Sequence, residues 1–271
     1  MKKLDELPNT HQIGAVQSLS KELRAIHEKH PDKVLFYRGH CDGSYEIKPP
    51  IYRKVEYLKK EERMFHEIQC KCTHEFQQCR SNLDKLVKMQ HYSLPTRLLD
   101  VTSNPLVALY FAANECQDKK GSLLVFVLDP SDVYYADAPE VTILANLALL
   151  PFETDVETDE GRKLLINRIN GDASNAYFGD VRLCNKVLCV KPYLNNTRII
   201  RQSGAFLIFG MKNRKEKMAD SNIEYYELKI PGRKKENVMK DLEFLDVNKA
   251  TLFPDIDHVS DYLKSMCSDG K

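Results

Sequence analysis

The residues best suited to chemistry gather in the segment MQHYSLPTRLLDVTSNPLVALYFAA, which begins at Met89. Seven polar side chains stand there beside strongly apolar stretches: Gln90, His91, Thr96, Arg97, Asp100, Thr102 and Ser103. The apolar residues predict a buried strand followed by a helix, so several of these polar groups must lie at the wall of a core. Either they pair with charged neighbours and cap the helix, or they line a cleft at the end of the strand. A helix N-terminus beside such a cleft would also favour an anion.

A second candidate is Arg38, in the segment VLFYRGHCDG that begins at Val34. In a strand, Val34, Phe36 and Arg38 lie on one face, so the arginine is in line with core residues where the apolar run ends. Such an arginine either forms an ion pair at the sheet edge, with Asp100 as one partner, or holds an anion at the mouth of a cleft.

Histidines and cysteines offer two further kinds of chemistry. His91 has the right ordinary pKa for acid–base catalysis near neutral pH, the alternative being a helix-end or core histidine. His66, Cys70 and His74 share one face of a predicted helix, but the third lies two turns from the first, and we expect no metal site. The eight cysteines form no C-x-x-C pair, which predicts reduced thiols.

Composition limits the class of protein. The chain has 271 residues, 42% of them hydrophobic, with 40 Lys plus Arg against 39 Asp plus Glu. It therefore has a core but no overall field that would recruit nucleic acid or a membrane. The basic clusters KNRKEK, GRKKEN and NNTRIIRQ are either a local phosphate-binding face or solvated surface. Without an apolar segment long enough to span a membrane, we expect a soluble, cytoplasmic protein with no membrane partner.

The elements that position these residues follow from periodicity and capping. An amphipathic helix runs from Val16 to Ile26, a long helix is expected from Tyr57 to about Arg80, and a shorter one follows Ser81. Strands are expected near 34, at 96–101 and in GSLLVFVLDP, NKVLCVKP, GAFLIFG and IEYYELKIP. Ser103 or Asn104 is expected to cap a helix that begins at Pro105. The pattern predicts an α+β fold in which a single domain over 34–263 has a mixed β-sheet flanked by helices. A helical segment, 1–33, precedes it, and a helical insertion is expected near 138–180.

Four motifs, in order, resemble the FRG domain family: FYRG, the long segment around residues 89–113, RIIRQSGAFLIFG and TLFPDIDHVSDYL. The resemblance spans roughly residues 34–263. It implies a shared fold and an association with bacterial defence or toxin-like proteins, and it assigns no activity.

A weaker likeness is to the ADP-ribosyltransferases, which cleave NAD. An early-strand arginine, a hydroxyl residue before a helix and a late polar residue match Arg38, Thr102 or Ser103, and Gln202. The likeness implies an ADP-ribosyltransferase-like fold and NAD as substrate, with the remaining cleft groups Gln90, Thr96, Arg97, Asp100 and Ser103 helping Arg38 to bind it. Gln202 stands where that family has an acid, and a neutral amide cannot replace a carboxylate. Another acid must then serve, with Glu62, Glu224 and Glu227 as candidates.

Two functions therefore remain open. One is an ADP-ribosyltransferase-like or NAD-cleaving enzyme, with a protein or nucleic acid as acceptor, in which Arg38, His91, Thr102, Gln202 and Glu62 carry the chemistry. The other is a module that binds a nucleotide or nucleic acid without catalysis.

Overall fold

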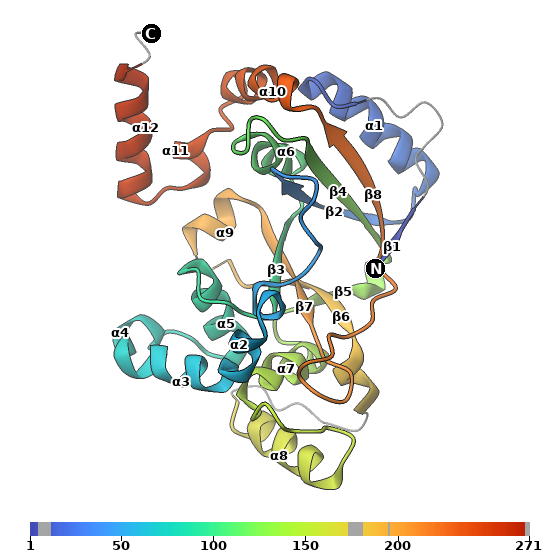
Figure 1. Ribbon diagram of the computed structural model, residues 1–271, viewed down its shortest axis with the longest axis vertical. Helices are drawn as coiled ribbons and strands as arrows, with labels where there is room; N and C mark the ends of the chain where they lie inside the picture. Colours follow the sequence, from blue (N-terminus) through green and yellow to red (C-terminus); the bar gives the residue numbers. More distant parts are fainter. Residues whose placement is uncertain (5–11, 173–180, 195, 269–271) are drawn as a thin grey trace.

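The computed structural model describes residues 1–4, 12–172, 181–194 and 196–268 (Figure 1). Its strands are β1 (Lys2–Lys3), β2 (Val34–His40), β3 (Leu98–Thr102), β4 (Gly121–Leu128), β5 (Val133–Tyr135), β6 (Val187–Lys191), β7 (Gly204–Phe209) and β8 (Glu224–Ile230). The α-helices are α1 (Val16–Lys29), α2 (Val55–Lys59), α3 (Glu61–Lys71), α4 (Thr73–Phe76), α5 (Asn82–His91), α6 (Pro105–Ala113), α7 (Pro139–Asn146), α8 (Asp159–Asn170), α9 (Thr197–Arg201), α10 (Gly232–Phe244), α11 (Lys249–Leu252) and α12 (Ile256–Ser268). Short 3₁₀ turns are η1 (Pro50–Arg53), η2 (Pro130–Asp132), η3 (Leu147–Leu149) and η4 (Val181–Asn185).

The described strands form one mixed sheet in the order β1-β8-β4-β2-β3-β7-β6-β5. The pairs β1–β8 and β5–β6 are parallel, and the other neighbours are antiparallel. Helices flank this sheet, so the predicted α+β fold is confirmed.

The sheet is nearly divided at its centre. β2 pairs with β4 along its whole length and β3 does the same with β7, whereas β2 and β3 meet only at Tyr37 and Thr102. We call this junction the seam. It joins one half-sheet, β1-β8-β4-β2, to the other, β3-β7-β6-β5.

Each half-sheet has its own helical cover. α1, α6 and α10 pack on the first half, and α5, α7 and α8 pack on the second (Figure 1). The remaining faces share a core in which Phe36 and Phe126 meet Leu99 and Leu207, closed by Ile51 of η1. The seam therefore lies between buried layers, where strand ends and helix ends come together.

α6 lies unusually close to the first half-sheet. A Cβ placed on Gly39 would be 2.0 Å from the carbonyl oxygen of Ala108 and 2.5 Å from the amide nitrogen of Ala112. Glycine at position 39 of the FYRG motif is therefore required by the backbone of α6. Asn104 is the cap of this helix, because its side chain accepts a hydrogen bond from the amide of Leu106 at 2.9 Å.

Three expectations about local structure need correction. The single helix predicted from Tyr57 to Arg80 is broken at Lys60 and Cys72, where the backbone leaves helical values. At the second break the Thr73 hydroxyl donates to the carbonyls of Gln69 and Cys70, and such back-bonding bends helices. The spacing of Phe65, Ile68, Cys72, Phe76 and Cys79 predicts one buried stripe on a single helix, but the break leaves Cys72 exposed. The strand predicted at 96–101 occupies Leu98–Thr102, since Thr96 and Arg97 direct their side chains into buried contacts.

Residues 138–180, where a helical insertion is expected, contain α7 and α8, and residues 173–180 lie outside the described part of the chain. No helix among the described residues is both long and apolar enough to cross a membrane.

The expectation of eight reduced thiols is wrong for one pair. Cys41 and Cys116 form a disulfide, whereas Cys70, Cys72, Cys79, Cys184 and Cys189 are free. Their separation of 75 residues carries no sequence signal of pairing, and the two cysteines meet because β2 and the turn after α6 end side by side.

Candidate functional site

A cleft of about 460 Å³ opens at the seam. Many of the polar residues predicted from the sequence line it: Arg38, Gln90, His91, Asp100, Thr102 and Gln202. They come from β2, α5, β3 and the end of α9, and the cleft exists because β2 and β3 separate on either side of their single pair.

Arg38 bridges the two half-sheets where the pairing stops. Its Nη1 donates to the backbone carbonyl of Asp100 at 2.5 Å and lies 3.8 Å from the carboxylate of the same residue. The guanidinium thus takes the place of a strand–strand hydrogen bond, and its side chain stays only 18% exposed. The sequence allows Asp100 to pair with Arg97 or with Arg38, and the Arg38–Asp100 pair is the one that forms, because Arg97 is bound to Glu61.

His40 holds Arg38 from the other side. Arg38 Nε donates to His40 Nε2 at 3.0 Å, which requires a neutral imidazole. Burial, together with the charges of Arg38 and Arg53, lowers the pKa of His40 to about 4, so the ring is neutral at physiological pH. His40 and Arg38 lie two residues apart on one face of β2, so strand alternation in the sequence could have identified His40 as a neighbour of Arg38.

Two further arginines line the cleft: Arg53 of η1, which the sequence reasoning missed, and Arg198 of α9, which belongs to the basic cluster NNTRIIRQ. Burial lowers the pKa of Arg198, and the charge of Asp100 opposes that shift. The Arg198 guanidinium lies 4.6 Å from the ring centre of Phe253, a cation–π contact that holds it in place. Guanidinium groups stay protonated in proteins, so the three arginines bring three positive charges to the cleft.

Asp100 is the only carboxylate among the described residues that line this cleft. Its side chain is 59% exposed and accepts a hydrogen bond from Gln90 Nε2 at 3.0 Å. Gln90 is oriented by Thr96, whose hydroxyl donates to Gln90 Oε1 at 2.7 Å. The cleft therefore has an excess of positive charge and a carboxylate whose position is fixed.

The predicted hydroxyl and amide groups have structural partners. Thr102 donates to the backbone carbonyl of Gln202 at 2.6 Å and accepts from the amide of Asn104 at 3.0 Å. The Gln202 side chain donates to the carbonyl of Leu252 at 3.1 Å. His91 lines the cleft, and burial and the charge of Arg198 lower its pKa.

Other predicted residues lie elsewhere. Ser103 is exposed and contacts the Ser203 carbonyl at 3.4 Å. The three candidate acids have basic partners of their own: Glu62 pairs with Arg168, Glu224 with Lys2 and Glu227 with Lys3. None of these four residues lines the cleft in the described part of the chain.

Arg97 belongs to a buried ion cluster instead of the cleft. Its Nε and Nη2 donate to the two carboxylate oxygens of Glu61 at 2.9 and 2.6 Å, and Lys215 Nζ lies 3.0 Å from the same carboxylate. The side chains of Arg97 and Lys215 are fully buried, and that of Glu61 is 4% exposed. Arg97 also donates to the carbonyl of Phe209, so the cluster ties α3 to β3 and β7.

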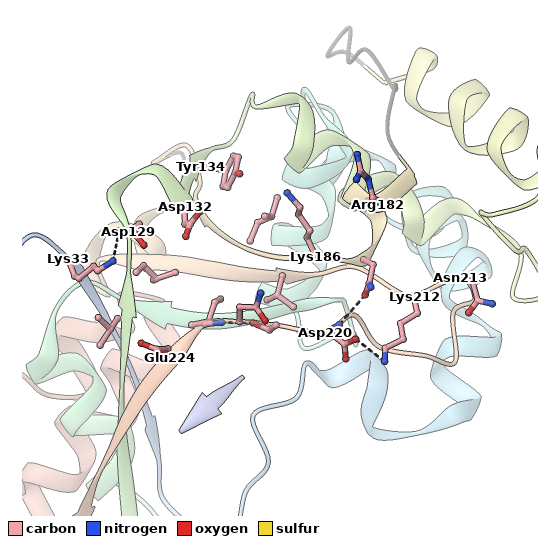
Figure 2. Close-up of a pocket in the computed structure, with 18 of the residues that line it drawn as sticks. Lys33, Asp129, Asp132, Tyr134, Arg182, Lys186, Lys212, Asn213, Asp220 and Glu224 are labelled. Carbon is pink, nitrogen blue, oxygen red and sulfur yellow. Dashed lines mark hydrogen bonds and ion pairs between the residues drawn. The ribbon is translucent and has the colours of Figure 1, made fainter. Parts of the chain in front are cut away.

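A larger cavity, of about 1320 Å³, lies between the ends of β4, β6 and β8 (Figure 2). Basic and acidic residues line it in equal numbers, five of each, and Lys33–Asp129 and Lys212–Asp220 are paired at 2.5 and 2.9 Å. Of the predicted site residues only Glu224 reaches it. Its charges offset one another, so the smaller cleft is the stronger candidate site.

Comparison with known proteins places part of this site in a family. No curated protein matches the chain, and no solved structure matches it. The family model of the FRG domain matches residues 33–121. That segment contains β2, β3, α6 and, from the cleft, Arg38, Arg53 and Asp100, whereas the two later motifs lie beyond the match. Residues 33–121 are therefore an FRG domain, which confirms the family indicated by the FYRG motif.

Proposed function

We propose that the cleft at the seam binds a phosphate-bearing nucleotide, with NAD as the first candidate. The observation that carries this proposal is the convergence of Arg38, Arg53 and Arg198 on a cleft with one carboxylate among its described lining residues. Arginine presents a planar, permanently charged fork that matches the oxygens of a phosphate. A diphosphate would neutralise the excess charge that the cleft otherwise leaves to solvent.

The uncharged lining supports the same class of ligand. Val107, Phe111 and Ile199 give the cleft an apolar wall beside the arginines. Ligand sites commonly combine apolar walls with a few fixed polar groups. A nucleotide has both parts, since its base is flat and largely apolar and its phosphates are charged.

We expect Arg38→Ala to weaken NAD binding about tenfold or more, because a charge-assisted hydrogen bond to a phosphate is lost. Isothermal titration of the purified protein with NAD, and with ADP as a shorter probe, measures the change. Arg38→Lys should recover only part of the affinity, since it keeps the charge but loses the fork.

The matched control is Arg63→Ala, at an arginine of α3 whose side chain is 76% exposed and which does not line the cleft. It should bind as the wild type does. Equal affinity of the Arg38 and Arg63 variants, with both folded, would remove the cleft from consideration as the nucleotide site.

A second candidate function is NAD cleavage, favoured by the position of Asp100 in the cleft beside Arg38. In such a reaction the bond between nicotinamide and ribose breaks, and its electron pair leaves with nicotinamide. The sugar cation that forms is stabilised by a nearby carboxylate until water or an acceptor adds to it. Asp100 would supply that charge, because Gln202 is neutral and its amide is bound to Leu252.

We expect Asp100→Asn to lower nicotinamide release about a hundredfold while NAD binding changes little, because the amide keeps the shape and loses the charge. Release is followed by chromatography, with Glu62→Gln as the control acid outside the cleft. Wild-type protein that binds NAD and releases no nicotinamide would favour the non-catalytic binding module.

A further inference from the structure

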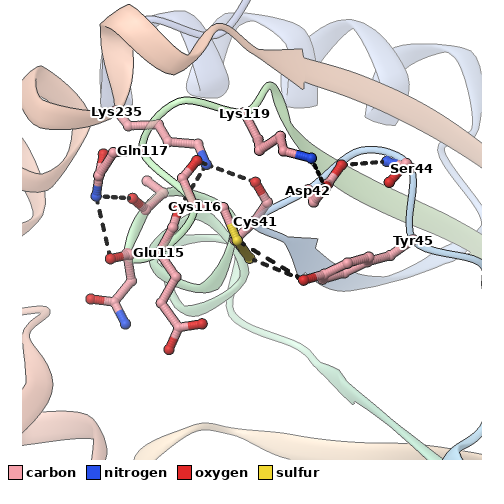
Figure 3. The surroundings of a disulfide bond; sticks show 11 residues. Cys41, Asp42, Ser44, Tyr45, Glu115, Cys116, Gln117, Lys119 and Lys235 are labelled. Atoms are coloured by element: carbon pink, nitrogen blue, oxygen red, sulfur yellow. Dashed lines mark hydrogen bonds and ion pairs between the residues drawn. A yellow bond between two sulfur atoms is a disulfide. The ribbon is translucent and has the colours of Figure 1, made fainter.

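The disulfide between Cys41 and Cys116 joins the end of β2 to the turn after α6 (Figure 3). Cys41 directly follows His40, whose ring holds Arg38, and Cys116 lies in the turn between α6 and β4. Their Cα atoms are 5.5 Å apart. Cys41 is buried at 8% exposure and Cys116 is half-buried, so Cys116 is the sulfur that a reagent reaches first.

Lys235 of α10 fixes the backbone of both cysteines. Its ammonium group donates to the carbonyls of Cys41, Glu115 and Cys116 at 2.7, 2.8 and 2.9 Å, and the residue is fully buried. Figure 3 shows the lysine reaching both segments from the side opposite Tyr45. These hydrogen bonds involve backbone oxygens and do not depend on the bond between the sulfurs.

Two more contacts join the same segments. The amide of Gly43 donates to the carbonyl of Lys120 at 2.8 Å, and Lys119 pairs with Asp42 at 3.1 Å. The two strand ends therefore stay docked whether or not the disulfide is closed. The folded arrangement of these segments therefore does not require the cross-link, which adds stability mainly by restricting the unfolded chain.

We infer that Cys41 and Cys116 form a reversible redox couple, and that its state is transmitted to Arg38. A dithiol reductant opens it in two exchange steps. The first thiolate of the reductant attacks Cys116 Sγ, which breaks the protein disulfide and releases Cys41 as a thiolate that takes up a proton. The second thiol of the reductant then attacks the mixed disulfide and releases Cys116 as a thiol. The reductant leaves as a cyclic disulfide, so two electrons have passed to the protein.

Tyr45 is the connection to the cleft. Its hydroxyl lies 3.9 Å from Cys41 Sγ and 4.0 Å from Cys116 Sγ, and its ring meets that of His40 edge-on, with centres 5.9 Å apart. Opening the disulfide separates the two sulfurs and displaces the tyrosine that packs against His40. His40 is the acceptor for Arg38 Nε, so the guanidinium loses a fixed support.

Thiol labelling tests the couple without any ligand. The purified protein is treated with dithiothreitol, alkylated and mapped by mass spectrometry, while circular dichroism follows the fold. We expect Cys41 and Cys116 to become reactive with an unchanged spectrum, and the bond to re-form when oxidised dithiothreitol is added. The exposed Cys70 and Cys72 label in both states and serve as internal controls. Unpaired cysteines under oxidising conditions, or unfolding upon reduction, would overturn the inference.

Lys235→Met tests the role of the lysine. We expect the disulfide to re-form about tenfold more slowly in this variant, because the local concentration of one thiol near the other falls. If Lys235→Met does not fold, the Lys119→Ala variant takes its place. This change, at an exposed residue, removes the ion pair with Asp42 and should also slow re-formation of the disulfide. Closure at the wild-type rate in the folded variant contradicts a preorganised couple.

Hydrogen exchange and nucleotide binding test the transmission to Arg38. We expect amides 38–41 to exchange faster in the reduced protein, whatever the ligand.

The second readout, NAD affinity, rests on the proposed function. NAD should bind about fivefold more weakly after reduction. The Cys116→Ser variant should show this weaker affinity with or without dithiothreitol. Unchanged exchange at 38–41 would refute the transmission. Faster exchange in a protein that binds NAD in neither state would refute only the proposed function.

Discussion

Glu61→Gln is expected to lower the free energy of unfolding by about 3–5 kcal/mol, the usual cost of removing one partner from a buried ion pair. The carboxylate balances two fully buried cations, Arg97 and Lys215, and the amide would leave both without a counter-charge. This loss is a large part of the stability of an ordinary domain, so the variant should unfold at a much lower urea concentration.

The neighbouring residue provides the control for this substitution. Glu62 pairs with Arg168 in a half-exposed position, and Glu62→Gln should cost less than about 1 kcal/mol. If the two variants unfold at the same urea concentration, the cluster does not hold α3 against β3 and β7.

Acid should remove the same contribution in the wild-type protein. Burial alone raises the pKa of Glu61, but the charges of Arg97 and Lys215 outweigh it, and the folded value lies below the ordinary 4.5. Stability that depends on this carboxylate is therefore present above pH 4.5 and is lost as the pH falls toward the folded pKa. The difference between wild type and Glu61→Gln should shrink over that range in urea titrations.

Gly39→Ala is expected to cost about 3 kcal/mol or more, because the added methyl group meets backbone and not a movable side chain. The Cβ would lie 2.0 Å from the Ala108 carbonyl oxygen, so α6 must move away from β2. Thermal unfolding followed by circular dichroism measures the loss. Shortening Ala108 to glycine should not restore stability, since the clashing atom is in the main chain.

Gly14→Ala is the matched control for this substitution. Its Cβ would meet only the flexible side chain of Lys234, at 3.5 Å or more, and the change should be within about 0.5 kcal/mol of neutral. If the Gly39→Ala protein proved as stable as the Gly14→Ala protein, α6 would not depend on close contact at the FYRG glycine.

Much of the cleft follows from local sequence. Strand alternation places Arg38 on the same face as Phe36, and the apolar run ends where the seam begins. The short distance along the chain from Gln90 to Asp100 lets one helix and the following strand present both residues together. These inferences need only periodicity and the order of two elements.

The remaining parts depend on contacts between distant segments. Arg53 and Arg198 enter the cleft from a 3₁₀ turn and a short helix that lie far apart along the chain, and neither lies in an element with strong periodicity. Arg97 precedes β3, where alternation does not yet fix its direction, and its destination depends on Glu61 and Lys215. Position along the chain alone could not distinguish an arginine that faces solvent from one that faces a buried carboxylate.

The seam also bears on how this FRG domain could be inherited. The matched residues 33–121 include β3. However, β3 pairs along its length with β7, which lies beyond the match. It meets β2, which lies within the match, through one residue pair only. Arg198 and Gln202, which also line the cleft, lie beyond it as well. A gene fusion that transferred the matched segment alone would carry β3 without β7 and a cleft that lacks six of its lining residues. Recombination that preserves the cleft must therefore move the later strands together with the motif.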